Sequence, residues 1–266
     1  MAGSVFAFLF YFSGMAACYL FFRRKLAKSF RLAVLTYHQV NCGAVDRDIG
    51  VSLNNFIRQM DYLSREYDVI SAADLSERLN GKDLRLARDT VVITFDDGYG
   101  DNYSNALPVL RKYGLPAVVF LIVDKIGAPG MLGIDAINEM SASGISFGSH
   151  TFSHPVLSGL SRDSQYHEIN GSKSALEDKT GKKVDFFAFP KGKKKDLNSA
   201  CREFARSAGY KLAFTTENGS VEAGNDLFDL KRIGIRDCPL FVFKARLSGI
   251  FESKFLMAAR KLTGIS

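Results

Sequence analysis

Two adjacent carboxylates, Asp96 and Asp97, follow an apolar run of β-favouring residues and precede Gly98. A continuous run such as residues 91–95 is typical of a strand that is buried on both faces of a parallel sheet. Such folds place their chemistry at the C-terminal ends of the strands. Neighbouring acids repel each other unless they share a cation or a proton. The pair therefore indicates either a site for metal and proton chemistry or an ordinary Asp-Asp-Gly surface turn.

Two of the four histidines of the chain, His150 and His154, stand four residues apart after Ser149. Pro155 disfavours helical geometry at His154, so we expect a loop in which the two imidazoles converge. One carboxylate and two imidazoles form a recurring metal set that leaves positions open for water and substrate. This set suits Zn²⁺, with Co²⁺, Mn²⁺ or Ni²⁺ as alternatives. A second carboxylate beside the metal could take the proton from an attacking water.

Several motifs, taken in order, resemble those of the polysaccharide deacetylases, which form carbohydrate esterase family four. The resemblance covers roughly residues 31 to 240. Its first and last segments resemble the subset of the family that includes the poly-N-acetylglucosamine deacetylases. The matching segments are Leu35 to Val40, Thr94 to Gly98, His150 with His154, Phe187 to Gly192, and Arg232 with Ile233.

The resemblance implies a distorted (β/α)₇ barrel that removes acetyl groups from N-acetylated sugars in a metal-dependent reaction. Carried over by position, Asp96 is the catalytic base. The backbone N–H of Lys191, just after Pro190, would help to hold the oxyanion, and Arg232 is grouped with these two residues as a substrate or oxyanion contact. The implied metal ligands are Asp97, His150 and His154.

This chain departs from the resembled family at two places. Many members carry an arginine near the position of Ala188, where it orients the base, and a tyrosine at the position of Lys191. A late histidine that serves many members as general acid is absent, because no histidine follows His167. His38, at the end of the first expected strand, could supply that proton. It could equally be a core histidine whose ring bonds a backbone carbonyl.

Strand and helix patterns alternate after residue 31, which predicts one α/β barrel rather than two domains. Helix starts are expected at the capping residues Ser52, Ser71 with Asp74, and Asn198. The expected strands cover residues 32–38, 67–70, 90–95, 117–123, 145–148, 186–189, 211–215 and 231–235.

Both ends of the chain differ in character from the predicted catalytic barrel at residues 31–238. Residues 5–22 carry no charge and approach the length that crosses a bilayer, so residues 1–25 are predicted to be an uncleaved single-pass anchor. The basic residues that follow favour a cytoplasmic catalytic domain, whereas the family resemblance favours an extracytoplasmic one. Residues 239–266 are predicted to form a basic amphipathic helix, either on the membrane surface or packed outside the barrel.

Composition limits the other classes of function. Hydrophobic residues make up 47 % and charged residues 24 % of the 266 residues, as in an ordinary globular core. The net charge of +7 comes partly from two local clusters, so it indicates a solvated face or an anionic lipid surface rather than nucleic-acid binding. No two of the four cysteines form a Cys-x-x-Cys pair, which argues against cysteine ligation of zinc.

Two other functions remain open from the sequence. The same chemistry could act on a lipid-linked amino sugar of the membrane instead of a polysaccharide. The barrel could also be a non-catalytic, membrane-bound carbohydrate-binding protein, although Asp96 and the three candidate ligands are all retained.

Overall fold

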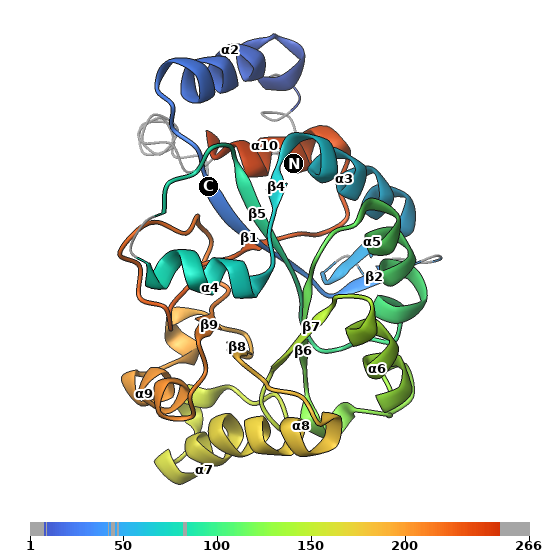
Figure 1. Ribbon diagram of the computed structural model, residues 1–266, viewed down its shortest axis with the longest axis vertical. Helices are drawn as coiled ribbons and strands as arrows, with labels where there is room; N and C mark the ends of the chain where they lie inside the picture. The colour runs from blue at the N-terminus through green and yellow to red at the C-terminus, as the bar shows by residue number, and fades with distance from the viewer. Residues whose placement is uncertain are drawn as a thin grey trace.

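The architecture is a curled parallel half-barrel, seen in a computed structural model that describes residues 8, 10–41, 43, 46, 48–81 and 84–250 (Figure 1). All strand pairs of the main sheet are parallel. This confirms the predicted α/β architecture. In spatial order the strands are β10 (Ile233–Gly234), β1 (Leu32–Tyr37), β5 (Thr90–Phe95), β6 (Val118–Leu121), β7 (Ser146–Ser149), β8 (Phe186–Ala188) and β9 (Leu212–Phe214), with β4 (Asp68–Val69) paired to the start of β5.

The chain between β9 and β10 bridges the two edges of this curled sheet. The N–H of Thr215 donates to the carbonyl of Leu230 over 2.8 Å, and the N–H of Arg232 donates to the carbonyl of Glu217 over 2.9 Å. A few residues later, Ile235 donates to the Thr36 carbonyl beside β1. The segment that carries Arg232 therefore lies between the first and last long strands of the sheet.

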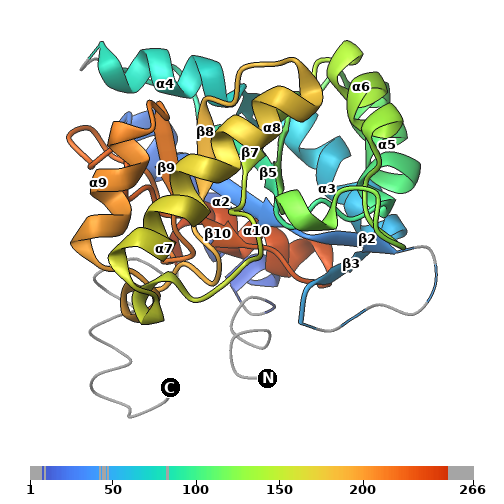
Figure 2. The same cartoon turned by 90° about the horizontal axis from the view of Figure 1, so that it is seen from below.

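Helices cover the outside of the sheet (Figure 2). The three predicted capping sites are confirmed: Ser52 and Asn198 each accept a backbone N–H of the first turn, and Ser71 forms a capping box with Asp74. The α-helices of the barrel are α3 (Leu53–Glu66), α4 (Ala72–Asn80), α5 (Leu107–Tyr113), α6 (Ile134–Ala142), α7 (Arg162–Tyr166), α8 (Ser172–Thr180), α9 (Ser199–Ser207) and α10 (Leu240–Ser248). Shorter π or 3₁₀ turns are η2 (Asn102–Ala106), η3 (Val123–Lys125), η4 (Leu157–Gly159), η5 (His167–Gly171) and η6 (Lys194–Asp196).

Strand β5 is buried along its whole length, which explains its continuous apolar sequence. Val91 and Ile93 pack in the large core between the sheet and the helices, with Phe56 of α3. Val92 points to the other face and packs in the interior of the half-barrel with Phe120. Because both faces are covered, the C-terminal end of β5 is held firmly in place.

Two short parallel strands, β2 (Gln39–Asn41) and β3 (Gly50–Ser52), form a separate sheet that the sequence did not predict. They have three residues each, too few for a period-two pattern to be recognised. Strand β2 begins two residues after the end of β1.

The N-terminal region differs from the predicted single spanning helix. Gly14 adopts a left-handed backbone with φ of 81°, which separates the residues before it from α2 (Met15–Phe21). The π-turn η1 (Phe22–Leu26) continues α2, and no helix among the described residues is both long and apolar enough to cross a membrane. Residues 1–7 and residue 9 of the predicted anchor lie outside the described residues.

The predicted C-terminal helix over 239–266 is described only as α10 and the two residues after it. Phe243 and Leu247 of α10 are buried in the main core. Val242 and Ala245 of the same helix pack in a separate cluster with Tyr11. This part of the predicted helix packs on the outside of the barrel, which is one of the two predicted alternatives. Residues 251–266 lie outside the described residues.

Candidate active site

Residues from several strands meet at the C-terminal rim of the half-barrel, as expected for a parallel α/β fold. Asp96 and Asp97 follow β5, and His150 follows β7. Backbone bonds fix their positions, because the N–H of Asp96 donates to the Tyr37 carbonyl and the N–H of His150 donates to the Leu121 carbonyl. The surface-turn alternative for the two aspartates is therefore wrong, since Asp96 is only 1 % exposed.

Asp97, His150 and His154 converge in a geometry that can hold a metal ion. One ligand atom from each lies within 4.8 Å of the others. The Asp97 Oδ1 atom lies 3.6 Å from His150 Nε2 and 3.4 Å from His154 Nε2. Asp97 and His154 both adopt left-handed backbone, with φ of 72° and 65°. Such strain in non-glycine residues is typical of functional sites, where surrounding contacts enforce it.

The ring of His150 is oriented by a backbone carbonyl. Its Nδ1 lies 2.7 Å from the Ala188 carbonyl oxygen at the end of β8. A carbonyl can only accept, so Nδ1 carries a proton and Nε2 is the ring nitrogen that faces Asp97. Metal-binding histidines are commonly fixed by such a bond from the second ring nitrogen. The residues present therefore fit a divalent cation.

A buried carboxylate holds the loop that carries both histidines. Glu168 is almost fully buried, and its Oε2 accepts the N–H groups of Phe152 over 2.8 Å and Ser153 over 3.1 Å. Its Oε1 accepts the Ser153 hydroxyl over 2.7 Å. Because these two residues lie between His150 and His154, Glu168 helps to set the distance between the imidazoles. The sequence contained no local signal for this contact, which joins positions 15 and 16 residues apart.

Asp96 forms a fully buried ion pair with Arg232. Both guanidinium NH₂ groups reach the carboxylate over 2.7 Å, one to each oxygen. The arginine is held in turn by the Thr215 carbonyl over 2.8 Å and the Thr94 hydroxyl over 3.1 Å. Burial by itself raises the pKa of Asp96, but Arg232, together with the charges of His150 and His38, more than offsets this effect, so the pKa lies well below its usual range. Asp96 is therefore ionised at neutral pH.

The placement of Arg232 differs from its predicted grouping with the substrate and oxyanion contacts. It is 1 % exposed, and its donors are directed at Asp96, Thr94 and Thr215 instead of the open rim. It thus orients Asp96, the contact that the family resemblance implied for an arginine near Ala188. The pairing spans 136 residues, so no local motif could have revealed it.

His38 lies directly after β1 on the same rim. Its carbonyl accepts the side-chain amide of Asn102 over 2.7 Å, which fixes the backbone there. Burial lowers the pKa of His38, and the charges of Asp96 and Asp97 offset only part of that effect. The imidazole is thus near both aspartates and neutral at neutral pH.

Pro190, Lys191 and Gly192 form a tight turn just after β8. Lys191 has left-handed backbone with φ of 58°, and its carbonyl accepts the Thr216 hydroxyl. Among the described residues, the backbone hydrogen bonds include none donated by the N–H of Lys191. The positive charge of Lys191 also acts on His154. Burial and the charge of His150 contribute more, and together they lower the pKa of His154 to about 4.

Tyr99 is a further residue of the site that the sequence did not single out. Burial and the charge of Asp97 raise the pKa of its hydroxyl to about 12. The hydroxyl therefore stays protonated and can donate a hydrogen bond near the candidate ligand set. Its position two residues after Asp97 could have drawn attention, but a tyrosine after glycine carries no specific pattern.

The acids and imidazoles lie at the C-terminal rim of the parallel half-barrel, where such folds carry their chemistry. The profile of the family described as polysaccharide deacetylase matches residues 84–213. The Bacillus subtilis protein YxkH, whose name also assigns it to the polysaccharide deacetylases, is 32 % identical over 212 residues, which are 79 % of this chain and 74 % of that protein. The chain therefore belongs to the polysaccharide deacetylase family and is a hydrolase that acts on carbon–nitrogen bonds.

Two named enzymes are also similar to this chain. The poly-β-1,6-N-acetyl-D-glucosamine N-deacetylase of Staphylococcus aureus is 27 % identical over 170 residues, and the match spans 58 % of this chain and 57 % of that enzyme. The solved structure of the Streptococcus pyogenes deacetylase PplD in complex with acetate superposes with a TM-score of 0.72. It is 29 % identical, and the match covers 77 % of this chain and 92 % of PplD.

Proposed function

We propose that this protein removes N-acetyl groups from a polysaccharide that contains N-acetylhexosamine, in a reaction that depends on a divalent metal. The observation that carries the proposal is the position of the Asp97, His150 and His154 ligand atoms directly beside a buried, ionised Asp96. A ligand set and a separate base on one rim are what amide hydrolysis by an activated water requires.

Asp97, His150 and His154 would hold the metal, for which Zn²⁺ is our first choice because it favours one carboxylate and two imidazoles with an open position. When bound, the cation supplies Lewis-acid polarisation of the amide carbonyl and makes water more acidic. Co²⁺, Mn²⁺ and Ni²⁺ accept the same donors.

Asp96 acts as the base in this proposal. Each carboxylate oxygen accepts one bond from Arg232 and keeps a further lone pair for a proton. Arg232 keeps Asp96 ionised before the reaction and fixes its orientation. The proton that the attacking water loses is held on an oxygen of Asp96.

The remaining steps are assigned to Lys191 and His38. In the turn that Pro190 begins, the backbone N–H of Lys191 donates a hydrogen bond to the oxyanion that forms on the acetyl carbonyl. His38 donates the proton that the leaving amine nitrogen needs, since it shares the rim with Asp96. It does so as the imidazolium, which takes its second proton from solvent before the reaction and returns to the neutral imidazole after donation. The lowered pKa makes this imidazolium a stronger acid.

The substrate class is supported by the similarity to the Staphylococcus aureus poly-N-acetylglucosamine deacetylase. That match covers little more than half of either protein, so the polymer and its linkage belong to the proposal. The retained base and ligand set argue against a carbohydrate-binding protein without activity.

The test is acetate release by the purified full-length chain. Metal-free enzyme would be given β-1,6-linked N-acetylglucosamine oligomers or a lipid-linked N-acetylated amino sugar, with Zn²⁺ or each alternative ion added back. We expect release from the oligomers only when metal is present. Release from the lipid-linked sugar alone would overturn the polysaccharide assignment, and full release without metal would overturn the metal dependence.

A further inference from the structure

The N-terminal segment carries most of the exposed apolar side chains of the described chain. Among the described residues, eight large apolar side chains are exposed, and six of them lie within residues 8–26. Phe12 is 67 % exposed and Leu26 is 64 % exposed. Single exposed apolar residues are normal, whereas a group of them marks an interaction surface. The six are Phe8, Phe12, Met15, Phe21, Phe22 and Leu26.

Other residues of the same segment are buried against the fold, so packing fixes the position of the segment. Phe10 and Ala16 are buried with Ile250 at the end of α10, and Tyr11 packs against Val242. Figure 1 shows α2 on the outside of the molecule, beyond α10. The segment therefore holds its exposed apolar side chains in a fixed position against α10, where the rings of Phe8 and Phe12 also contact Phe241.

Basic residues follow or adjoin these exposed apolar side chains in the sequence. Arg23 and Arg24 are bound to Asp89, whereas the ion pairs of the described part of the chain include neither Lys25 nor Lys28. Both lysines are exposed. Exposed aromatic and aliphatic residues next to lysines are typical of helices that lie in the interface of an anionic membrane.

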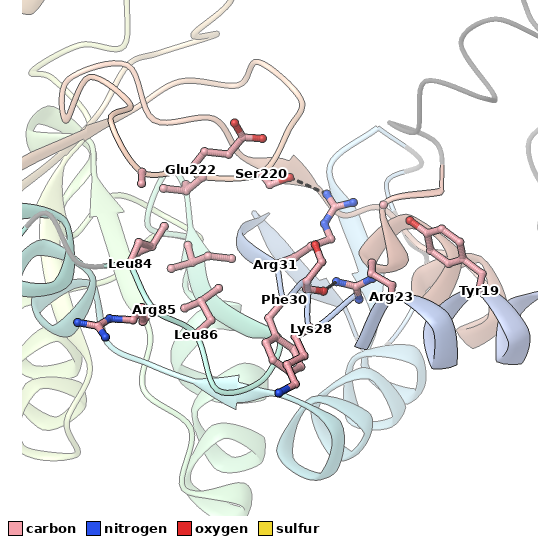
Figure 3. Close-up of a pocket in the computed structure, with 15 residues that line it drawn as sticks. Tyr19, Arg23, Lys28, Phe30, Arg31, Leu84, Arg85, Leu86, Ser220 and Glu222 are labelled. Atoms are coloured by element: carbon pink, nitrogen blue, oxygen red, sulfur yellow. Dashed lines mark hydrogen bonds between the residues drawn. The ribbon is translucent and has the colours of Figure 1, made fainter. Parts of the chain in front are cut away.

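A basic cavity of about 750 Å³ opens beside the same segment (Figure 3). This volume lies within the range of roughly 300–1,000 Å³ that is usual for ligand sites. Four basic side chains and one acidic side chain line it, together with apolar groups that include Leu84 and Leu86. The charged ones are Arg23, Lys28, Arg31, Arg85 and Glu222. A phosphate with an attached apolar chain matches such a lining.

We propose that Phe8 and residues 10–31 form a docking surface for a bilayer that contains anionic phospholipid. The exposed apolar side chains enter the membrane interface, and the cavity beside Lys28 takes the phosphate of a lipid headgroup. In this arrangement the segment lies on the bilayer. The proposal does not depend on which reaction the C-terminal rim performs.

The docking surface sets the orientation of the protein. The cavity includes Leu32, the first residue of β1, so it lies at the N-terminal ends of the strands. The candidate active site lies at their C-terminal ends, and six-residue strands such as β5 span about 20 Å. The active-site rim therefore faces away from the bilayer.

Co-sedimentation of the full-length chain with lipid vesicles tests the surface. We expect binding when about one third of the lipid is phosphatidylglycerol and at least tenfold weaker binding to phosphatidylcholine alone. Replacing both Phe21 and Phe22 by Gln should weaken binding at least tenfold. The matched control Tyr166→Gln changes an exposed aromatic residue of α7 and should leave binding unchanged. Equal binding to both kinds of vesicle, or no loss in the double variant, would overturn the proposal.

Two single lysine variants test the role of the cavity. Lys25→Gln removes a charge outside the cavity lining and should weaken binding about fivefold, as for one basic residue near an anionic surface. Lys28→Gln removes a lining charge and should weaken binding more than Lys25→Gln does. Lys182→Gln, on another exposed part of the chain, is the control. Equal losses for the first two variants would overturn the headgroup assignment.

Inorganic phosphate distinguishes a lipid headgroup from a free anion. At a concentration equal to that of the anionic lipid, it should not release the protein from the vesicles. Release would show that the cavity takes a free phosphate and would overturn lipid docking. Thermal melting of every variant, compared with the unchanged chain, separates lost binding from lost folding.

Discussion

The two ends of β5 each carry a buried aspartate that is bound by arginine. At the C-terminal end, Asp96 accepts two bonds of 2.7 Å from Arg232. At the N-terminal end, Asp89 accepts two bonds from Arg23, of 2.8 and 2.6 Å, and one of 2.6 Å from Arg24. In both cases burial raises the pKa of the carboxyl group, but the arginines, joined at Asp96 by the charges of His150 and His38, outweigh it and lower the pKa.

The partners distinguish the two pairs. Asp89 also accepts the N–H of Arg31, so four donors from one nearby segment surround its two oxygens. It therefore anchors residues 23–31 to the base of the sheet. Asp96 has two donors from Arg232 and lies beside the candidate metal ligands, which leaves it able to accept a proton. The same kind of ion pair thus anchors a neighbouring segment at one end of the strand, and at the other end it orients the carboxylate that we propose as the base.

The largest expected effect comes from the ligand set next to Asp96. Asp97→Ala, His150→Ala or His154→Ala should each abolish stoichiometric metal binding and activity together, because no ligand of a three-residue set is redundant. Elemental analysis of the purified variants and acetate release measure the two losses. Full metal occupancy in all three variants would mean that the metal is held elsewhere.

Asp96→Asn removes the base while it keeps the size of the side chain. Turnover should fall about 10²- to 10⁴-fold, the usual contribution of a positioned proton acceptor, while metal content stays near that of the unchanged chain. Steady-state kinetics on folded, metal-loaded protein measure this effect. A rate near that of the unchanged enzyme would exclude Asp96 as the base.

Asp89→Asn makes the matching change at the other end of β5 and should give the opposite result. It leaves Arg23 buried without its counter-charge, which costs about 3–5 kcal/mol in the free energy of unfolding. Turnover per folded molecule should not change, since Asp89 is far from the rim. Denaturant unfolding and kinetics on the folded fraction separate the two outcomes. A selective loss of turnover would contradict a purely anchoring role.

The Asp89 pair also predicts a dependence of stability on pH. Because the pKa of Asp89 is lower in the folded chain than in the unfolded one, its contribution is complete above the ordinary carboxyl pKa of about 4. The contribution is lost as the pH falls through the lower, folded-state pKa. Acid titration of the unfolding free energy should therefore show a smaller drop below pH of about 4 in Asp89→Asn than in the unchanged chain.

Glu168→Gln loosens the loop that carries His150 and His154 without touching either imidazole. A neutral amide accepts the loop N–H groups less strongly than a carboxylate does, and contacts of this kind typically change metal affinity about 10- to 100-fold. Competition with a chromogenic chelator measures the affinity. Glu203→Gln, an exposed glutamate on α9, is the control and should leave the affinity unchanged.

Arg232→Lys gives the smallest effect and probes the electrostatic side of the comparison. A lysine cannot make both bonds of the guanidinium, so the pKa of Asp96 should rise. The base is then protonated at a higher pH, and the acidic limb of the pH profile of kcat/KM moves upward. An unchanged acidic limb would show that Arg232 does not control the ionisation of the base.

The sequence by itself determined the elements and the chemical types of the site. The apolar run of residues 90–95, the helix caps at Ser52, Ser71 and Asn198, and the alternation of strands with helices were all recognisable, because each depends on neighbours within a few residues. The Asp96-Asp97 and His150–His154 patterns likewise supplied a base candidate and a ligand set before any geometry was known.

Only the tertiary structure decided which distant groups meet. Arg232 binds Asp96 across 136 residues, because the parallel topology brings the chain after β9 back beside β1 and β5. The sequence equally gave no indication that Asp89 would hold the arginines that follow α2, or that Gly14 would interrupt the predicted spanning helix. Hydrophobic periodicity indicates which face of an element is buried. Buried ion pairs depend instead on which elements, distant in the sequence, lie side by side in the fold. The surroundings of each aspartate were therefore decided by which arginine the fold placed against it.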